Sequence, residues 1–160
     1  MRIGILTQYF EPEIGAAPLR YRAVTRALAD EGHDVVVVTS LPNHPTGRIF
    51  DGYRGRPYRT ERHGRVTVHR SWLFPAVGSG LKRYVNFVSF AVAVLPLLRH
   101  FRRCDVVVVE SPPITVGALG MVIRRLLGRP YVTYVSDLSS DSVADLGVPG
   151  AAVIGRALRA

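Results

Sequence analysis

Cysteine and lysine are nearly absent from this 160-residue chain, which contains one of each, Cys104 and Lys82. A single cysteine cannot form an internal disulfide or a cysteine-based metal cluster, so we expect a reducing compartment. The lysine is not part of a G-x-x-x-x-G-K-S/T sequence, which excludes a P-loop nucleotide site. No long apolar run opens the chain, so a secretory signal is not predicted and the first residues are expected to be mature protein.

Glycine is also missing where a dinucleotide-binding fold needs it. Such a fold has the sequence G-x-G-x-x-G after its first strand and an acidic residue at the end of its second strand. Here the first loop holds Gly15 alone, and the second predicted strand ends in Thr39 and Ser40. The sequence therefore argues against a nicotinamide cofactor, and we expect the domain to use no cofactor.

No apolar stretch is long enough to cross a membrane. Residues 84–98 form an uncharged run of fifteen positions, whereas a bilayer needs about 20. Basic residues flank this run on both sides, and Pro96 would disturb its last turns. The helix predicted over residues 81–103 therefore either packs between the sheet and its neighbours or lies in the headgroup region of an anionic membrane.

The net charge of +9 comes from one region of the chain. Residues 48–103 hold twelve arginine or lysine residues against Asp51 and Glu61, whereas acids and bases nearly balance elsewhere. Such a region attracts nucleic acid, anionic lipid headgroups or a phosphorylated substrate, and composition does not choose among them. Because no RNA-binding motif accompanies the tyrosines and arginines of residues 53–59, we expect no nucleic-acid partner.

Buried-strand patterns alternate with helical patterns along most of the chain. Apolar runs that are typical of parallel strands covered on both faces occur at residues 2–7, 34–39, 105–109 and 131–135. Helices are predicted at residues 18–30, 81–103 and 114–127. A hairpin is predicted over residues 58–70. These patterns predict one α/β domain over residues 1–160, with a Rossmann-like, doubly wound, mainly parallel sheet and helices on both faces.

The loop after the first predicted strand, QYFEPEIGAAPLR, leads directly into a helix. A strand, loop and helix in this order present backbone N–H groups to a phosphate-bearing ligand. We therefore expect part of an enzyme that handles an activated, anionic substrate. The second strand is followed by the loop LPNHPTGRIFDGYRG, which is too long for a simple connector. Loops of this length are usually functional or disordered.

Three loops follow one another in a specific order: TQYFEPEIGAAPLR, LPNHPTGRIFDGYRG and, after the valine run, ESPPITVGALG. Together they resemble the N-terminal half of family-4 glycosyltransferases, most closely the cell-surface polysaccharide subgroup that includes the fucosamine transferase of O-antigen assembly. The resemblance implies a GT-B enzyme with two Rossmann-like domains across a cleft. This chain would be its N-terminal, acceptor-side domain, without the C-terminal donor-binding domain, and its last residues are expected to belong to an interrupted helix.

The resemblance also implies an activity. A retaining transferase of this family moves a hexosyl or aminohexosyl group from a nucleotide-diphosphate sugar donor to a lipid-linked or polysaccharide acceptor. A polyprenyl-diphosphate acceptor would account for a basic region beside an apolar helix, and would place the protein in the cytoplasm, peripherally at the inner face of the cell membrane. We expect this chain to be inactive alone. The alternative is a non-catalytic basic module that binds anionic membrane or nucleic acid.

No metal site is expected. The sequence contains no Asp-x-Asp pair, which metal-dependent transferases use to hold a cation on the donor diphosphate. The family is likewise metal-independent. His63 and His69 show no ligand spacing with cysteine or carboxylate residues. The leaving-group charge would then be stabilised by N–H groups and basic side chains.

By similarity, Gly15 lies where the first loop approaches the donor phosphates, although a left-handed turn alone would also require a glycine. Arg20, one turn into the helix, either contacts the diphosphate or is solvated. Asn43 and His44, in the second loop, are expected to bind the acceptor. A histidine beside two prolines is also typical of a solvated loop residue.

The family usually carries Arg-Asp-Leu-Trp-Pro-Glu after the fourth parallel strand, where residues 136–141 of this chain are Ser-Asp-Leu-Ser-Ser-Asp. The resemblance makes Asp137 the catalytic candidate, which would orient an acceptor hydroxyl. An aspartate at this place serves equally well as a helix N-cap. Asp141 replaces the glutamate and is expected to bind the acceptor.

Overall fold

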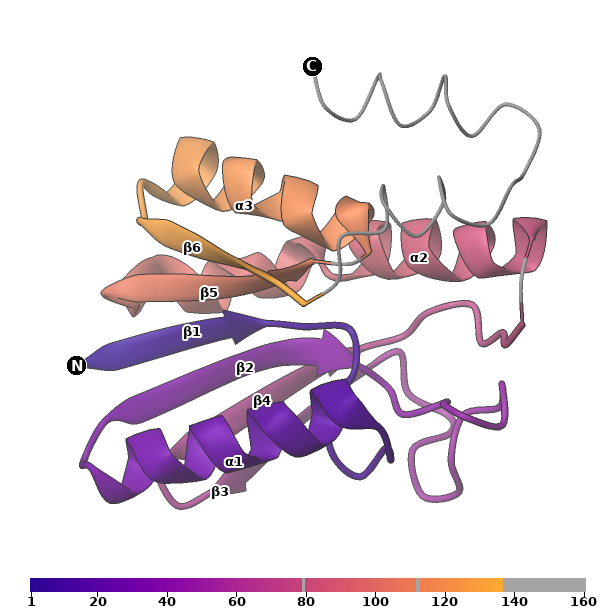
Figure 1. The fold of residues 1–160 in the computed structure, drawn as a ribbon, viewed down its shortest axis with the longest axis horizontal. Coiled ribbons are helices and arrows are strands. Elements are labelled where there is room, and N and C mark those ends of the chain that lie inside the picture. The colour runs from indigo at the N-terminus through magenta and orange to yellow at the C-terminus, as the bar shows by residue number, and fades with distance from the viewer. Residues whose placement is uncertain (79, 112, 137–160) are drawn as a thin grey trace.

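The computed structural model describes residues 1–78, 80–111 and 113–136. Two predicted site residues, Asp137 and Asp141, lie outside this part of the chain. Within it, six strands form one sheet in the order β3-β4-β2-β1-β5-β6 (Figure 1). The strands are β1 (Arg2–Leu6), β2 (Asp34–Ser40), β3 (Tyr58–His63), β4 (Val66–Ser71), β5 (Val106–Ser111) and β6 (Tyr131–Val135).

All neighbouring strands of this sheet are parallel except β3 and β4, which form the predicted antiparallel hairpin. Strand β2 is buried along its whole length after Asp34, because helices cover both faces of the sheet where it lies. Unbroken valine runs are typical of such strands. The prediction of a Rossmann-like α/β fold with a mainly parallel sheet is confirmed.

Helices pack on both faces of the sheet, as the doubly wound topology predicts. They are α1 (Ala16–Asp30), α2 (Leu81–Ala93), the 3-10 helix η1 (Leu95–Arg103) and α3 (Ile114–Leu127). α3 ends at Gly128, which has a left-handed backbone with φ 65°, the usual helix stop for glycine.

The prediction of one continuous helix over residues 81–103 is wrong. α2 ends at Ala93, η1 begins at Leu95, and the two are bent by 49°. Pro96 lacks an N–H group and its ring crowds the preceding turn, so an α-helix does not continue through it. In the described part of the chain no single helix is long and apolar enough to span a bilayer, although this bent pair meets that test jointly.

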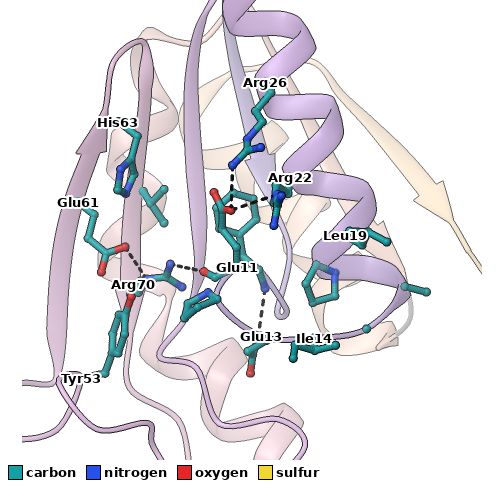
Figure 2. Close-up of a pocket in the computed structure, with 16 residues that line it drawn as sticks. Glu11, Glu13, Ile14, Leu19, Arg22, Arg26, Tyr53, Glu61, His63 and Arg70 are labelled. Atoms are coloured by element: carbon teal, nitrogen blue, oxygen red, sulfur yellow. Dashed lines mark hydrogen bonds and ion pairs between the residues drawn. The ribbon is translucent and has the colours of Figure 1, made fainter.

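On one face of the sheet, α1 is the covering helix among the helices of the described residues. Tyr21 of α1 and Phe10 of the preceding loop pack against Ile5, Val35 and Val37 of the central strands. On the side of α1 that faces the β3–β4 hairpin, a cavity remains open (Figure 2).

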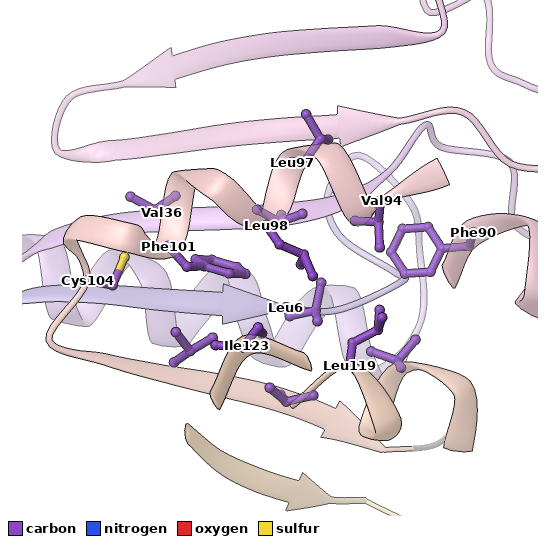
Figure 3. Close-up of a cluster of buried hydrophobic side chains, with 14 of the residues drawn as sticks. Leu6, Val36, Phe90, Val94, Leu97, Leu98, Phe101, Cys104, Leu119 and Ile123 are labelled. Carbon is purple, nitrogen blue, oxygen red and sulfur yellow. The ribbon is translucent and has the colours of Figure 1, made fainter. Parts of the chain in front are cut away.

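The opposite face is covered by α2, η1 and α3 (Figure 3). Phe90, Phe101 and Ile123 from these helices are fully buried against the sheet. Phe101 lies directly on Gly4 of β1, where an added Cβ would come within 2.7 Å of the phenyl ring. The absence of a side chain at Gly4 therefore allows η1 to approach the sheet closely.

Candidate functional site

The carboxyl ends of β1, β2 and β5 meet at one edge of the sheet, because these strands are parallel neighbours. Ligands of open α/β sheets bind outside this edge. The loop after β1 carries Gly15, the loop after β2 carries Asn43 and His44, and Arg20 follows in α1. Four predicted site residues therefore belong to segments at or next to this edge.

Gly15 immediately precedes α1 and has φ 157° and ψ 176°, a backbone conformation found almost only in glycine. A Cβ at this position would meet Pro18 Cδ at 3.7 Å, an ordinary contact. Backbone geometry, rather than lack of space, thus requires the glycine. The first N–H groups of α1 have no acceptor within the helix, and no side chain of the described residues caps them.

A cavity of about 210 Å³ lies beside the start of α1, and we call it the edge cavity. It is lined by Gly15 and His44, which the sequence placed in different loops, and by Tyr9. Arg83 and Asn86 of α2 also line it. Sequence reasoning missed these two residues, because their only signal is a position near the start of an apolar helix.

The edge cavity presents several hydrogen-bond donors to a ligand. The rings of Tyr9 and His44 meet edge to face, with centroids 5.7 Å apart. Burial raises the pKa of the Tyr9 hydroxyl, and the nearby Arg83 guanidinium opposes this rise. The hydroxyl is therefore a neutral donor at physiological pH. Together with the Arg83 guanidinium and the N–H groups of α1, it favours an anionic or hydroxyl-rich ligand.

Glu13 connects the two loops that form this edge. Its side chain is buried, and Oε1 accepts the backbone N–H groups of Asn43 at 2.8 Å and of His44 at 2.9 Å. Oε2 accepts the N–H of Phe10 at 3.3 Å. Burial raises the pKa of the Glu13 carboxyl, and the three N–H donors partly offset that effect. Glu13 thus fixes the position of His44 relative to the first loop.

Asn43 is buried beneath the loop rather than exposed at the edge cavity, since only 1% of its surface is accessible. Its side-chain amide donates to the carbonyl of Leu41 at 3.2 Å. These contacts give Asn43 a role in shaping the loop. Acceptor binding by its side chain stays a prediction.

Arg20 points toward β5 and β6, away from the residues of the edge cavity. Its Nη2 donates to Glu110 Oε1 at 2.8 Å, and its guanidinium lies 4.6 Å from the ring centroid of Tyr134. The Thr7 hydroxyl donates to the other oxygen of Glu110. Burial raises the pKa of Glu110, and the hydrogen bonds from Thr7 and Arg20 oppose that rise. Arg20 is therefore paired and stacked, and contact with a diphosphate stays a prediction.

An amide pair holds α2 against the same edge. Gln8, fully buried after β1, donates from Nε2 to Asn86 Oδ1 at 2.6 Å. Asn86 in turn donates to the carbonyl of Phe74 at 2.6 Å. The chain thereby places the basic start of α2, including Arg83, beside the loop that carries Gly15.

Within the described ranges, no group of three or more histidine, cysteine, aspartate or glutamate residues could hold a metal ion. His69 instead stacks on His100, with ring centroids 3.6 Å apart, and shares a hydrogen bond of 2.9 Å with the Thr60 hydroxyl. His63 lies on the hairpin and lines a second cavity.

A family model described as a glycosyl transferase 4-like domain matches residues 15–160. A protein of Escherichia coli (strain K12), named as a candidate colanic acid biosynthesis glycosyl transferase, WcaI, is 29% identical over 153 residues. The match covers 94% of this chain and 37% of the Escherichia coli protein.

Sucrose-phosphate synthase from Thermosynechococcus elongatus has a similar structure, with a TM-score of 0.55 and 14% sequence identity. The match covers 86% of this chain and 33% of the synthase. At this identity the likeness concerns the fold, which it confirms as α/β and Rossmann-like. The chain thus spans about a third of the length of either protein.

Proposed function

Since the chain belongs to the family of glycosyl transferase 4-like domains, we propose that it forms the acceptor-side domain of a retaining glycosyltransferase. The enzyme would move a hexosyl or aminohexosyl group from a nucleotide-diphosphate donor to a lipid-linked or polysaccharide acceptor of the cell surface. The relative named for colanic acid biosynthesis supports a biosynthetic transferase. A second domain, outside this chain, would hold most of the donor, so the chain alone would be inactive.

The edge cavity is the observation that carries this proposal. Its volume of about 210 Å³ is smaller than a typical site for a whole small molecule, roughly 300–1,000 Å³, and suits one phosphate or part of one sugar. The N–H groups of α1 and the Arg83 guanidinium would stabilise negative charge on the leaving diphosphate. Such stabilisation requires no metal ion. His44 and Tyr9 would hydrogen-bond a sugar hydroxyl beside it.

Asp137 and Asp141 complete the proposal from outside the described residues. Asp137 follows β6 by two positions in the sequence, and β6 is the neighbour of β5 at the carboxyl edge. A carboxylate there would orient the acceptor hydroxyl for attack. Asp141 would bind the acceptor farther from the reacting atoms.

The surface of α2 supports a lipid-linked acceptor and a peripheral place on an anionic membrane. One face of this helix is apolar and exposed, with Leu81, Tyr84, Val85, Val88 and Val92 each more than 40% accessible. We call these five residues the apolar stripe. Lys82 and Arg83 lie beside it. An amphipathic helix of this composition binds an anionic bilayer. The same observation favours the alternative, a membrane-binding module without catalysis.

Titration of the ¹⁵N-labelled chain with inorganic diphosphate, followed by NMR, tests the edge cavity. We expect shifts of the backbone amides of Ala16, Ala17 and His44. Arg83→Gln should weaken binding about tenfold, because a charge-assisted contact is lost. Arg125→Gln, on the last turn of α3, is the matched control and should have no effect. Diphosphate binding that is unchanged by Arg83→Gln contradicts the proposed site.

A transferase assay tests the domain arrangement. The chain alone, supplied with nucleotide-sugar donors and a polyprenyl-diphosphate acceptor, should give no transfer. Turnover at ordinary enzyme rates, about 1 s⁻¹ or more, would show that the second domain is not needed. If the chain binds diphosphate and vesicles, but a protein that contains both domains transfers no sugar, the non-catalytic module is favoured.

A further inference from the structure

A second cavity lies between α1 and the β3–β4 hairpin, and the proposed function does not use it (Figure 2). We call it the flank cavity. Its volume is about 760 Å³, which is within the range of small-molecule sites, roughly 300–1,000 Å³. Gly15, Ala16 and Pro18 line both cavities, so the flank cavity and the edge cavity adjoin at the start of α1.

Two arginines of α1 line the flank cavity with incomplete partners. Arg22 and Arg26 stand one turn apart and both face Glu11 (Figure 2). Their closest nitrogens lie 3.8 Å and 4.0 Å from Glu11 Oε2, which is too far for a hydrogen bond. Two guanidinium groups thus share one carboxylate without hydrogen-bonding it. Their N–H groups can bind an anionic ligand.

The other charged groups of the flank cavity, Arg70, Glu61 and Glu13, are held by other partners. Arg70 is 2% exposed and donates from Nε to Glu61 Oε2 at 3.1 Å. It also donates to the carbonyl oxygens of Ser40 and Glu11, at 3.3 Å and 2.5 Å. The carboxylate of Glu13 accepts three backbone N–H groups, as described above. Over the whole lining the formal charges balance, with three arginines against three glutamates. The exposed ionic groups are Arg22, Arg26 and Glu11, so two guanidinium groups and one carboxylate face the solvent in the cavity.

Apolar and hydrogen-bonding groups surround these charges. Phe10, Pro12 and Val68 contribute apolar walls, while Tyr53 and His63 contribute polar ring atoms. A sugar ring has apolar C–H faces and a rim of hydroxyl groups, which match walls of this mixed kind. The two exposed guanidinium groups, which do not hydrogen-bond Glu11, favour a sugar that carries an acidic group.

We propose that the flank cavity binds an anionic sugar of the acceptor, with Arg22 and Arg26 holding its carboxylate or phosphate group. This inference rests on the proposed function, because a glycan could then extend from the edge cavity across the Gly15–Pro18 segment into the flank cavity. It assigns the acceptor to the class of acidic glycans. The two cavities would bind neighbouring parts of one substrate.

NMR titration of the ¹⁵N-labelled chain with D-glucuronate, D-glucose 6-phosphate and D-glucose tests the inference. We expect the two acidic sugars to shift the amides of residues 22–26 and 63, and D-glucose to bind at least about tenfold more weakly. The stronger of the two acidic probes identifies the group as carboxylate or phosphate. Equal binding of D-glucose overturns the inference.

Variants separate ligand binding from folding. Arg22→Gln with Arg26→Gln should weaken binding of the acidic probe about tenfold or more, whereas Arg124→Gln with Arg125→Gln, on α3, should leave it unchanged. Arg22→Lys with Arg26→Lys keeps the charge and should retain part of the affinity. Unchanged binding in the Gln variant, or an equal loss in the α3 control, overturns the inference.

Inorganic diphosphate reports separately on the edge cavity. If diphosphate still shifts Ala17 and His44 while acidic sugars shift nothing near Arg22, only the flank inference fails. If diphosphate shifts nothing while acidic sugars bind the flank cavity, the proposed function fails and the anionic-sugar site remains. The two conclusions are thus tested independently.

Discussion

The two faces of the sheet are covered very differently. One packs against α2, η1 and α3 in a cluster of fifteen buried residues, whereas the other packs against α1 in a cluster of seven. Buried apolar area stabilises a fold by about 25 cal/mol per Å², so most of the packing energy comes from the three-helix face. The face under α1 leaves part of the hairpin uncovered, and the flank cavity lies there. Most of the buried core thus lies on the three-helix face, and the proposed anionic-sugar site lies on the face under α1.

The largest expected effect is on the three-helix face. Phe101→Ala should lower the free energy of unfolding by about 3–5 kcal/mol, because the ring is fully buried and lies on Gly4. Urea denaturation followed by circular dichroism measures it. Ile14→Ala, at a side chain that is 82% exposed beside α1, should change the same quantity by less than about 0.5 kcal/mol. A similar loss of unfolding free energy in both variants would contradict the conclusion that the three-helix face supplies most of the packing energy.

The strands and most helix boundaries could be predicted from the sequence, because they depend on local patterns. The valines of β2 and the stop at Gly128 carry their signals within a few residues. Pro96 also indicated a disturbed helix near the break between α2 and η1, although the predicted helix continued through Pro96. Local patterns determine which elements form, and a helix interrupted by proline is the ambiguous case.

The partners within the site could not be predicted in the same way. Arg20 pairs with Glu110 across 90 positions, and Glu13 accepts N–H groups 30 and 31 positions away. Arg83 reaches the edge cavity because α2 packs beside the first loop. Such pairs form only when distant segments of the chain meet in the fold, and the sequence around either residue does not indicate its partner. The sequence predicted that the first two loops lie at one edge of the sheet, but it did not predict the contacts within them.

The next largest effect is expected at the edge where the two faces meet. Glu13→Ala should lower the free energy of unfolding by about 3 kcal/mol, because three backbone N–H groups lose a buried acceptor. It should also weaken diphosphate binding, since His44 is no longer held. Denaturation and the NMR titration measure the two effects.

Glu31→Ala is the control for the Glu13 variant. Glu31 lies at the other end of α1, its side chain is 72% exposed, and its ion pair with His33 spans 3.8 Å. An exposed pair of this kind contributes less than about 1 kcal/mol. Equal destabilisation by the two substitutions would show that the Glu13 contacts do not hold the loops.

The stacked pair of His69 and His100, on the three-helix face, makes the free energy of unfolding depend on pH. Burial, followed by the charges of His100, Arg99 and Arg2, lowers the pKa of His69 from 6.5 to about 4. The folded state therefore binds a proton less readily than the unfolded chain. The free energy of unfolding should be independent of His69 well above pH 6.5 and should fall by about 3 kcal/mol as the pH drops to 4. Denaturation at a series of pH values measures this slope.

His69→Gln isolates this contribution, because glutamine can still hydrogen-bond Thr60 but does not titrate. Burial raises the pKa of both Glu13 and Glu110, and a raised carboxyl pKa gives the opposite slope. Burial also lowers the pKa of His100, so the variant should lose the acid destabilisation attributed to His69 and keep the contributions of His100 and of the carboxylates. A wild-type slope that is unchanged by His69→Gln contradicts the assignment.

The smallest expected change in the free energy of unfolding concerns the outer surface of α2, on the three-helix face. Val88 of the apolar stripe is 51% exposed, so Val88→Ser should change the free energy of unfolding by less than about 0.5 kcal/mol. The same substitution should lower partitioning onto vesicles that contain anionic lipid about fivefold, because a valine no longer enters the bilayer. Sedimentation with vesicles measures it.

Val24→Ser on α1 is the matched control, since Val24 is 40% exposed and lies on the other face of the sheet. It should leave vesicle binding unchanged. The contrast matters because exposed apolar side chains on α2 add nothing to the core, so a role for them must come from a partner. Equal loss in both variants would mean that the membrane contacts the chain without preference for α2, and the two faces would then differ in packing alone.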